Sequence, residues 1–369
     1  MAKTEGKKKS NKLNLIICAI AFVVMIVYLL FVDGVDNIIA AFQKINPLFL
    51  LICAAFMVLY WLCEAGTIHI MLKTMHSKTR FWHSWFDTII GQYFNCITPS
   101  ASGGQPMQAY YLVKFGVPLG SAMTALLSRF IVYQFTLTIY SIIALVIGFN
   151  EFGTDLNQKG LMPFVFIGFA INTAVIIALI GIAVWKNGTL KIANWFISVG
   201  VKLHLVKNPM KWRLYIAREI EKFHNNFKFI KKNIPLIIKS FILNFIQLTL
   251  YFSISYLLYL GFGLKGTSLF QVISYQAFVL MISSFWPMPG AMGAAEFGYA
   301  GFFGTIFGEY VNVSTLLWRL FTFYMPIIVG VIVIMTMKNK GIEEPSDLDA
   351  KENVYNMEVA LENSEDASE

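Results

Sequence analysis

The chain has 369 residues, of which 57% are hydrophobic and only 14% are charged, and its mean hydropathy is +0.63. Soluble globular domains carry roughly 25% charged residues, so this composition excludes an ordinary soluble domain. The formal net charge is +8, but the basic residues gather at the N-terminus and in loops beside apolar runs, as in loops that face anionic lipid. This distribution argues against nucleic acid as a partner. The apolar runs reach the roughly 20 residues that cross a bilayer, which predicts an all-α polytopic membrane protein.

The start of the chain predicts a cytoplasmic N-terminus and two spans. Residues 1–12 are rich in lysine, and an apolar first span follows at Leu13–Val32. The span Pro47–Leu72 then returns to the cytoplasmic side and carries Glu64 in its inner half. The next loop, Lys73–His83, is basic and is therefore expected inside.

A break in the apolar pattern follows at Asn95–Pro106, with the sequence NCITPSASGGQP. It ends an apolar run with a proline, small residues and a glycine pair. The segment Leu119–Phe149 is predicted to cross outward, and Leu161–Trp185 to cross back.

The segment Lys186–Lys232 contains eleven Lys or Arg residues against two Glu, with aromatic residues interleaved. This pattern is typical of amphipathic helices that lie on a membrane surface. A calmodulin target or a nucleic-acid-binding segment would use similar residues, but the position between two spans favours a cytoplasmic linker at 186–232.

The second half of the chain repeats the plan of the first. Pro235–Phe262 is predicted to cross outward, a second break lies within Thr267–Gly308, and Val311–Met337 crosses inward. The remaining segment, 338–369, is acidic and poor in apolar residues, which predicts a disordered cytoplasmic tail.

The two breaks match each other in spacing. The second has the sequence WPMPGAMGAAE, and each break is followed by a span with one arginine, in LLSRF and in LLWRL. Pro287 follows Pro99 by 188 residues, Glu296 follows Gln105 by 191, and the two arginines lie 190 apart. These offsets predict an internal repeat, with units at 47–149 and 235–337.

Charge bias in the loops sets the orientation of the repeats. The segment around the first break begins and ends inside, and the segment around the second begins and ends outside. Each is therefore predicted to be a re-entrant helical hairpin, beside about six full transmembrane helices. Two repeats of opposite orientation, with broken helices near the midplane, are the architecture of many secondary transporters.

The breaks and the arginine spans are the candidate substrate site. A half-helix that begins at a break points its N–H groups inward and favours an anion such as a lipid phosphate. An intramembrane arginine costs on the order of 3 kcal/mol and needs a partner or a polar cavity. Glu296 is the expected partner of one arginine, and Glu64 or Asp87 of the other. The candidate substrate-binding residues are Thr98, Pro99, Ser100, Ser102, Gly103, Gly104, Gln105, Arg129, Tyr133, Pro287, Pro289, Gly290, Gly293, Glu296 and Arg319.

At TPSASGGQP and PMPGAMGAAE the sequence resembles a known family over roughly Leu13–Met337. It is similar to the membrane flippase domain of lysylphosphatidylglycerol synthase/flippase proteins (the multiple peptide resistance factor family) and their stand-alone relatives. The second motif departs from the family pattern, because Ala291 replaces one glycine.

The resemblance implies a multi-pass protein of a bacterial cell membrane that moves a polar lipid between leaflets. The lipid would be a phospholipid, such as aminoacylated phosphatidylglycerol, or a glycolipid, with antimicrobial peptide resistance as one consequence. Full-length members carry an aminoacyl-transfer domain after the membrane part, whereas a short acidic tail follows here. This chain is therefore not expected to make the lipid itself.

Two other classes of function remain open. An enzyme that acts on lipid headgroups would use Glu296 with Asp87 or Ser100. A non-transporting partner of a separate lipid synthase or glycosyltransferase would use the basic linker and the acidic tail for docking. The Arg–Glu pairs would then have only a structural role, in which they hold the two repeats together. A homo-oligomer is compatible with the sequence. No cofactor or metal site is predicted, because the four cysteines lie singly within apolar runs and the histidines do not cluster.

Overall fold

The computed structural model describes residues 43–76, 78–158, 160, 162–202, 209–283 and 286–339. The basic N-terminus, the first span and nearly all of the acidic tail lie outside the described residues. Within the described residues, every regular element is helical.

Among the described residues, five apolar stretches are long enough to cross a membrane. They are α3 (Pro47–Met75), the Leu119–Val146 part of α6 (Leu119–Gln158), α7 (Met162–Val184), α10 (Ile234–Gly261), and the run Ala294–Met337. The surface carries large apolar side chains such as Leu51, Val146 and Ile177, each at least 67% exposed. Polar side chains such as Asn172 and Asn244 are buried instead. An apolar exterior over a polar interior fits lipid as the surrounding solvent, so the chain is a multi-pass helical membrane protein.

The long apolar run 294–337 is not one straight helix. It contains α12 (Ala294–Phe307), a short 3-10 turn (Gly308–Tyr310), α13 (Val311–Arg319), a π-helical turn (Leu320–Tyr324) and α14 (Met325–Asn339). The chain reverses at Gly308, whose φ of 55° is a conformation that glycine adopts without strain. Pro326, which lacks an N–H donor, follows the π turn and accounts for the interrupted helical hydrogen bonds there.

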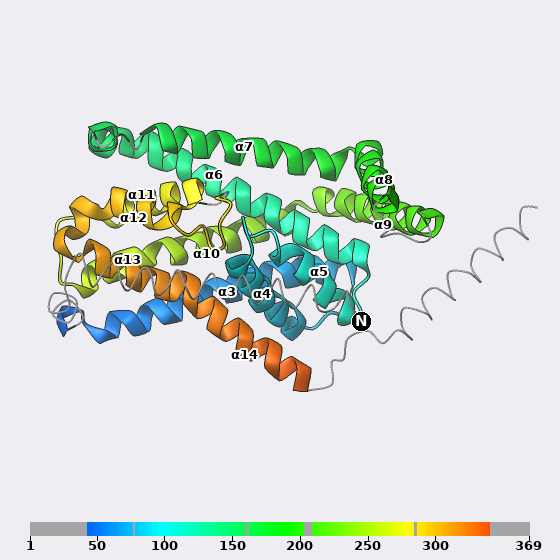
Figure 1. Ribbon diagram of the computed structural model, residues 1–369, viewed down its shortest axis with the longest axis horizontal. Coiled ribbons are helices and arrows are strands. Elements are labelled where there is room, and N and C mark those ends of the chain that lie inside the picture. The colour runs from blue at the N-terminus through cyan, green and yellow to red at the C-terminus, as the bar shows by residue number, and fades with distance from the viewer. Residues whose placement is uncertain are drawn as a thin grey trace, which may run out of the picture.

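Two helices begin with the same device. The side chain of Asn46 accepts a hydrogen bond from the backbone N–H of Leu48 at the start of α3, and Asn233 accepts one from Leu236 at the start of α10. Each cap is followed by a proline in the first helical turn, where no N–H is needed. The two helices then pack along each other at the centre of the molecule, as Figure 1 shows.

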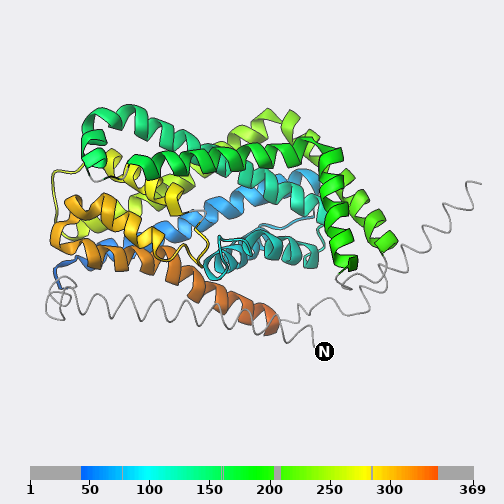
Figure 2. The same ribbon diagram turned by 45° about the horizontal axis from the view of Figure 1, so that its top comes forward.

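Two pairs of short helices flank this central pair. The first consists of α4 (Phe81–Ile97) and α5 (Gly104–Lys114), and the second of α11 (Leu269–Ser283) and α12. The 17 residues of α4 extend about 26 Å, less than the roughly 30 Å of a bilayer core. The pairs approach from opposite ends of the molecule, and their connecting turns meet in the middle (Figures 1 and 2).

Some helix boundaries differ from the sequence-based expectation. α3 continues to Met75 and α4 begins at Phe81, so the basic loop is shorter than Lys73–His83. α6 continues to Gln158, beyond the predicted end of its span at Phe149, and no proline interrupts the segment.

The basic linker forms two helices, α8 (Lys186–Lys202) and α9 (Pro209–Lys232), at one end of the molecule (Figure 1). They carry exposed aromatic side chains, among them Trp195 and Phe229. α9 also packs against α6, where Glu219 Oε2 accepts a hydrogen bond of 2.7 Å from the backbone N–H of Gly120. This carboxylate thus caps the N-terminus of α6, where the helix dipole favours negative charge.

We expect Glu219→Ala to destabilise the protein by about 1 kcal/mol, because it leaves N–H groups at the start of α6 without an acceptor. Thermal unfolding of the purified protein in detergent measures this change. Glu221→Ala is the control, since Glu221 forms only an exposed ion pair with Lys186 and should have little effect. Equal unfolding temperatures for the two variants would contradict the capping role.

Candidate functional site

The two connecting turns touch at the centre of the molecule. The first turn joins α4 to α5 through residues 98–103, and the second joins α11 to α12, with residues 286–293 described. A short antiparallel backbone bridge pairs Pro99 with Pro289, and Ser100 Oγ donates a hydrogen bond to the carbonyl oxygen of Trp286 at 3.4 Å. The predicted tip residues of the two halves are therefore neighbours in space.

Both turns hold non-glycine residues in a left-handed conformation. The φ angles of Ser100, Ala101 and Ala291 are 49°, 52° and 54°. Such angles are uncommon outside glycine, and they gather at sites where the surrounding structure forces a special geometry. Ala291 is the residue that departs from the family motif, and the protein keeps the conformation that a glycine would adopt there.

The glycine pair in the first turn serves close packing. A Cβ added at Gly104 would lie 1.9 Å from Asn95 Oδ1, and one added at Gly103 would lie 2.5 Å from Thr98 Cγ2. Thr98 Oγ1 also accepts a hydrogen bond from the backbone N–H of Gly103 at 2.9 Å. The pair lets α5 begin against α4, which any side chain would prevent.

Two N–H groups at the breaks already have acceptors within the protein. Thr98 Oγ1 accepts from the N–H of Gly103, and Glu296 Oε2 accepts from the N–H of Gly293 at 2.7 Å. Gly103 and Gly293 are the cap residues of α5 and α12, and neither provides a side-chain cap for the first N–H groups of its helix. An anion at the breaks would therefore meet the N–H groups of these first helical turns and the arginines, and this anion site stays a prediction.

Arg129 lies in α6 and is 7% exposed. Its Nη2 is 3.0 Å from Oε2 of Glu64, which is 1% exposed. The same carboxylate accepts hydrogen bonds from Gln92 Nε2 at 2.6 Å and from Gln247 Nε2 at 3.2 Å. Glu64 thus joins α3, α4, α6 and α10, and it is the partner that the sequence offered alongside Asp87.

One donor of Arg129 has no partner. Its Nε is buried, and no hydrogen bond from it to any described residue is present. The guanidinium also lies over the ring of Tyr133, with 5.6 Å between Cζ and the ring centroid. Tyr133, a predicted site residue, is therefore beside Arg129, whereas Gln134 points to α7 and donates to Asn172 Oδ1.

Arg319 is the last residue of α13 and is 5% exposed. Its Nε is 2.7 Å from Oε1 of Glu296, and its Nη1 donates to the carbonyl oxygen of Gly290 at 3.0 Å. Its Nη2 is buried without a hydrogen-bond partner among the described residues. The predicted pair of Arg319 with Glu296 is present, and the side chain of Glu296 stays 28% exposed. The π turn that follows Arg319 is a feature that recurs at functional sites.

Tyrosines connect the two arginines. Tyr133, beside Arg129, hydrogen-bonds with Tyr60, whose ring centroid is 5.4 Å from that of Tyr251. Tyr251 in turn interacts electrostatically with Arg319. Tyr60, Tyr251 and Gln92 were not predicted, because the chain has 16 tyrosines and these residues lie among many apolar neighbours. The sequence signal that could have identified them is a polar residue within an apolar helix, on the helix face that is turned toward Glu64.

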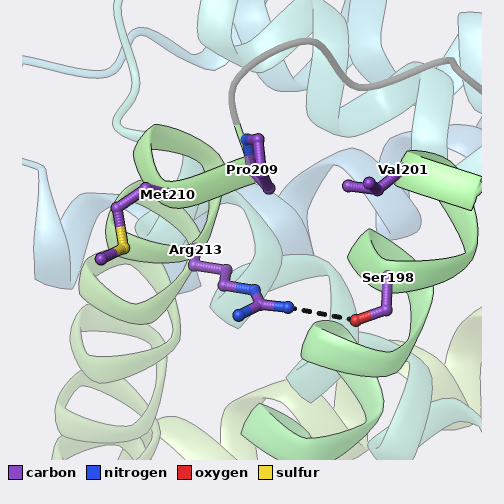
Figure 3. Close-up of a pocket in the computed structure, with 5 residues that line it drawn as sticks. All are labelled: Ser198, Val201, Pro209, Met210 and Arg213. Carbon is purple, nitrogen blue, oxygen red and sulfur yellow. Dashed lines mark hydrogen bonds between the residues drawn. The ribbon is translucent and has the colours of Figure 1, made fainter.

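A separate hollow lies far from these residues, in the elbow between α8 and α9. Figure 3 shows Arg213 Nη2 donating to Ser198 Oγ at 3.2 Å across it. None of the charged pairs above lines it. Among the described residues there is also no group of three or more His, Cys, Asp or Glu that could hold a metal ion.

The fold and the buried ion pairs define a multi-pass helical membrane protein with a polar, charged interior. The profile of the family described as lysylphosphatidylglycerol synthase TM region matches residues 16–330, and the chain belongs to this family. A UPF0104 membrane protein of Archaeoglobus fulgidus is 24% identical over 301 residues, which cover 79% of this chain and 87% of the relative. A UPF0104 membrane protein of Methanocaldococcus jannaschii is 24% identical over 347 residues, covering 88% and 95%.

We expect Gly290→Ala to destabilise the protein by about 1–3 kcal/mol. Its φ is 58°, and an added Cβ would lie 2.0 Å from the ring of Phe323, beside Arg319. Gly304→Ala is the matched control, because nothing lies within 4 Å of an added Cβ in that helix and alanine favours helices. Thermal unfolding in detergent measures the stability of the two variants. A Gly290→Ala variant as stable as Gly304→Ala would contradict the conclusion that the second turn has no room for a side chain at Gly290.

Proposed function

We propose that the protein is a lipid flippase, which moves a polar phospholipid or glycolipid between the two leaflets of a membrane. The observation that carries this proposal is that each of two buried arginines has an N–H donor without a hydrogen-bond partner among the described residues, and that one of them, Arg319, also donates to Gly290 of the second turn. A phosphate oxygen is the acceptor that such a donor prefers, because charge-assisted hydrogen bonds are stronger than neutral ones. The lipid headgroup would bind between the turns while its acyl chains stay in the bilayer.

Two inverted repeats account for the arrangement of the helices. In this reading α3 to α6 and α10 to α14 are the repeats, and the short helix pairs are re-entrant hairpins from opposite faces. Three observations support it: the matching Asn caps of α3 and α10, the contact of the two turns, and the common offset of 190 residues for Arg129 with Arg319 and for Pro99 with Pro289. Inverted repeats with broken helices at the midplane suit alternating access.

The two arginine sites suit different parts of a transport cycle. The Glu64 carboxylate holds Arg129 in a nearly closed network, whereas Glu296 is partly exposed beside Arg319. Arg319 is therefore the better first contact for a phosphate, and Glu296 is placed to meet a cationic group on the same lipid. An aminoacylated phosphatidylglycerol carries both charges. The N–H groups of Gly103 and Gly293 would play a smaller part, because side chains of the protein already accept their hydrogen bonds.

The charge distribution suggests how the protein lies in its membrane. Basic residues on α8, on α9 and in the 73–80 segment favour a cytoplasmic face at that end, with both termini on the same side. A bacterial cell membrane is the location that we propose. A separate synthase or glycosyltransferase would supply the lipid to this face, and transport of a cationic lipid to the outer leaflet would lower the attraction of antimicrobial peptides.

Reconstitution into lipid vesicles tests the proposal. We expect protein-dependent movement of labelled phospholipid across the bilayer, and a loss of at least tenfold in rate for Arg319→Ala, since one charge-assisted hydrogen bond contributes about 1.5–3 kcal/mol. Arg213→Ala is the control, because Arg213 is exposed in the linker and lies outside the site.

Arg319→Lys keeps the charge and separates electrostatics from the planar geometry of arginine. Thermal unfolding checks that each variant is folded. Wild-type protein that moves none of several anionic, zwitterionic and aminoacylated lipids would contradict the proposal. A folded Arg319→Ala variant with wild-type rates would leave Arg319 a structural residue.

A further inference from the structure

A third acidic residue lies next to the Arg129 site and forms no ion pair of its own among the described residues. Asp87 is in α4 and is 0% exposed. Neither oxygen of its carboxyl group has a hydrogen-bond partner among the described residues, and the hydroxyl groups of its helix neighbours Ser84 and Thr88 are likewise buried and unpaired. Gln108 of α5 lies across from it. Its Nε2 donates to the backbone carbonyl oxygen of Asp87 at 3.4 Å, and its amide also favours the charged form of the Asp87 carboxyl.

The charges around Asp87 do not balance. Its carboxyl interacts electrostatically with Glu64 of α3 and Arg129 of α6, and the amide of Gln108 is its other polar neighbour. The described side chains of α14, which also packs on α4, include no titratable group over 325–337. Two carboxyl groups therefore share one guanidinium in a buried place. A second buried carboxylate without its own partner is costly, and one bound proton removes that charge.

We propose that Asp87 binds and releases the proton that couples lipid movement to the transmembrane proton gradient. This inference rests on the proposed flippase function. In one state the carboxylate of Asp87 takes a proton from water on one side of the membrane and becomes a neutral carboxyl. In the other state the same proton leaves to water on the opposite side. One proton crosses for each such cycle, and no other reactant is needed.

Two histidines lie near the start of α4, the part of that helix before Asp87. His83 is one helical turn before Asp87 in α4. His69 in α3 interacts electrostatically with His83. Both rings are partly buried, and the Nδ1 atom of each has no hydrogen-bond partner among the described residues. Histidine carries protons near neutral pH, so this pair is suited to pass a proton between water and Asp87.

The second half of the protein holds a neutral pair where the first holds two acids. Ser255 and Gln276 lie 191 residues after Glu64 and 189 after Asp87, and Gln276 Nε2 donates to Ser255 Oγ. In this second half, Arg319 forms an ion pair with a single acidic residue, Glu296. An amide and a hydroxyl are therefore enough to join these helices. Packing alone does not require a carboxyl at Asp87, which favours a role in which its proton matters.

Vesicles with an imposed pH gradient test the coupling. For the wild type, a gradient of one pH unit should shift the steady-state ratio of labelled lipid between leaflets by up to about tenfold, because one pH unit is a tenfold ratio in proton activity. Asp87→Asn keeps the shape of the side chain but binds no proton, so its ratio should stay near one. Asp87→Glu should retain coupling. Glu309→Gln is the control, since Glu309 is exposed.

A second measurement does not depend on transport. Infrared difference spectra of the purified wild type, taken across a pH change, should contain the C=O band of a protonated carboxyl that Asp87→Asn lacks. Thermal unfolding checks that the variant is folded. The proton site is overturned if this band persists in Asp87→Asn, or if folded Asp87→Asn keeps the wild-type lipid ratio. In a third outcome, the wild type moves no lipid, but the carboxyl band of the wild type is absent from Asp87→Asn. This outcome would overturn the flippase function and its coupling to protons, while the proton site at Asp87 would stand.

Discussion

The need to neutralise buried arginines shapes the interior of this protein. A guanidinium that lacks water is tolerated only beside an opposite charge with further hydrogen bonds. Glu64 meets this need for Arg129 and is itself held by glutamines from two other helices. One carboxylate therefore fixes the relative positions of α3, α4, α6 and α10. The apolar outer surfaces of these helices could slide in lipid, but this network could not form in another register.

The second arginine is held in a different way. Glu296 bonds to Arg319 and at the same time caps the start of α12, so the end of α13 is tied to the second turn. The carbonyl of Gly290 adds a contact from the turn itself. Arg319 thus depends on the shape of a turn, whereas Arg129 depends on side chains in regular helices. A change in the second turn would reach Arg319 directly.

Local signals in the sequence predicted much of this arrangement. Proline and glycine mark the two breaks, and Glu296 lies close enough in sequence to the second break to suggest its pairing with Arg319. The equal offset of the arginines predicts two matching halves, which stay a proposal. The choice between Glu64 and Asp87 depended on how α3 faces α4, which no local pattern encodes. The capping of Gly103 by Thr98 and the extension of α6 beyond Phe149 also arise from packing and from missing helix breakers, so they were not predicted.

The contact between the two turns links binding to conformational change in the proposed cycle. Pro99 and Pro289 touch, and Ser100, Ala101 and Ala291 hold angles that ordinary side chains avoid. A headgroup that enters between the turns must separate them, and it can do so only if it binds the separated state more tightly than the closed one. The strained angles raise the energy of the closed state, which reduces the binding energy that the lipid has to supply. Arg319, which donates to Gly290 of the second turn and has a donor without a partner among the described residues, lies where that binding energy would be gained.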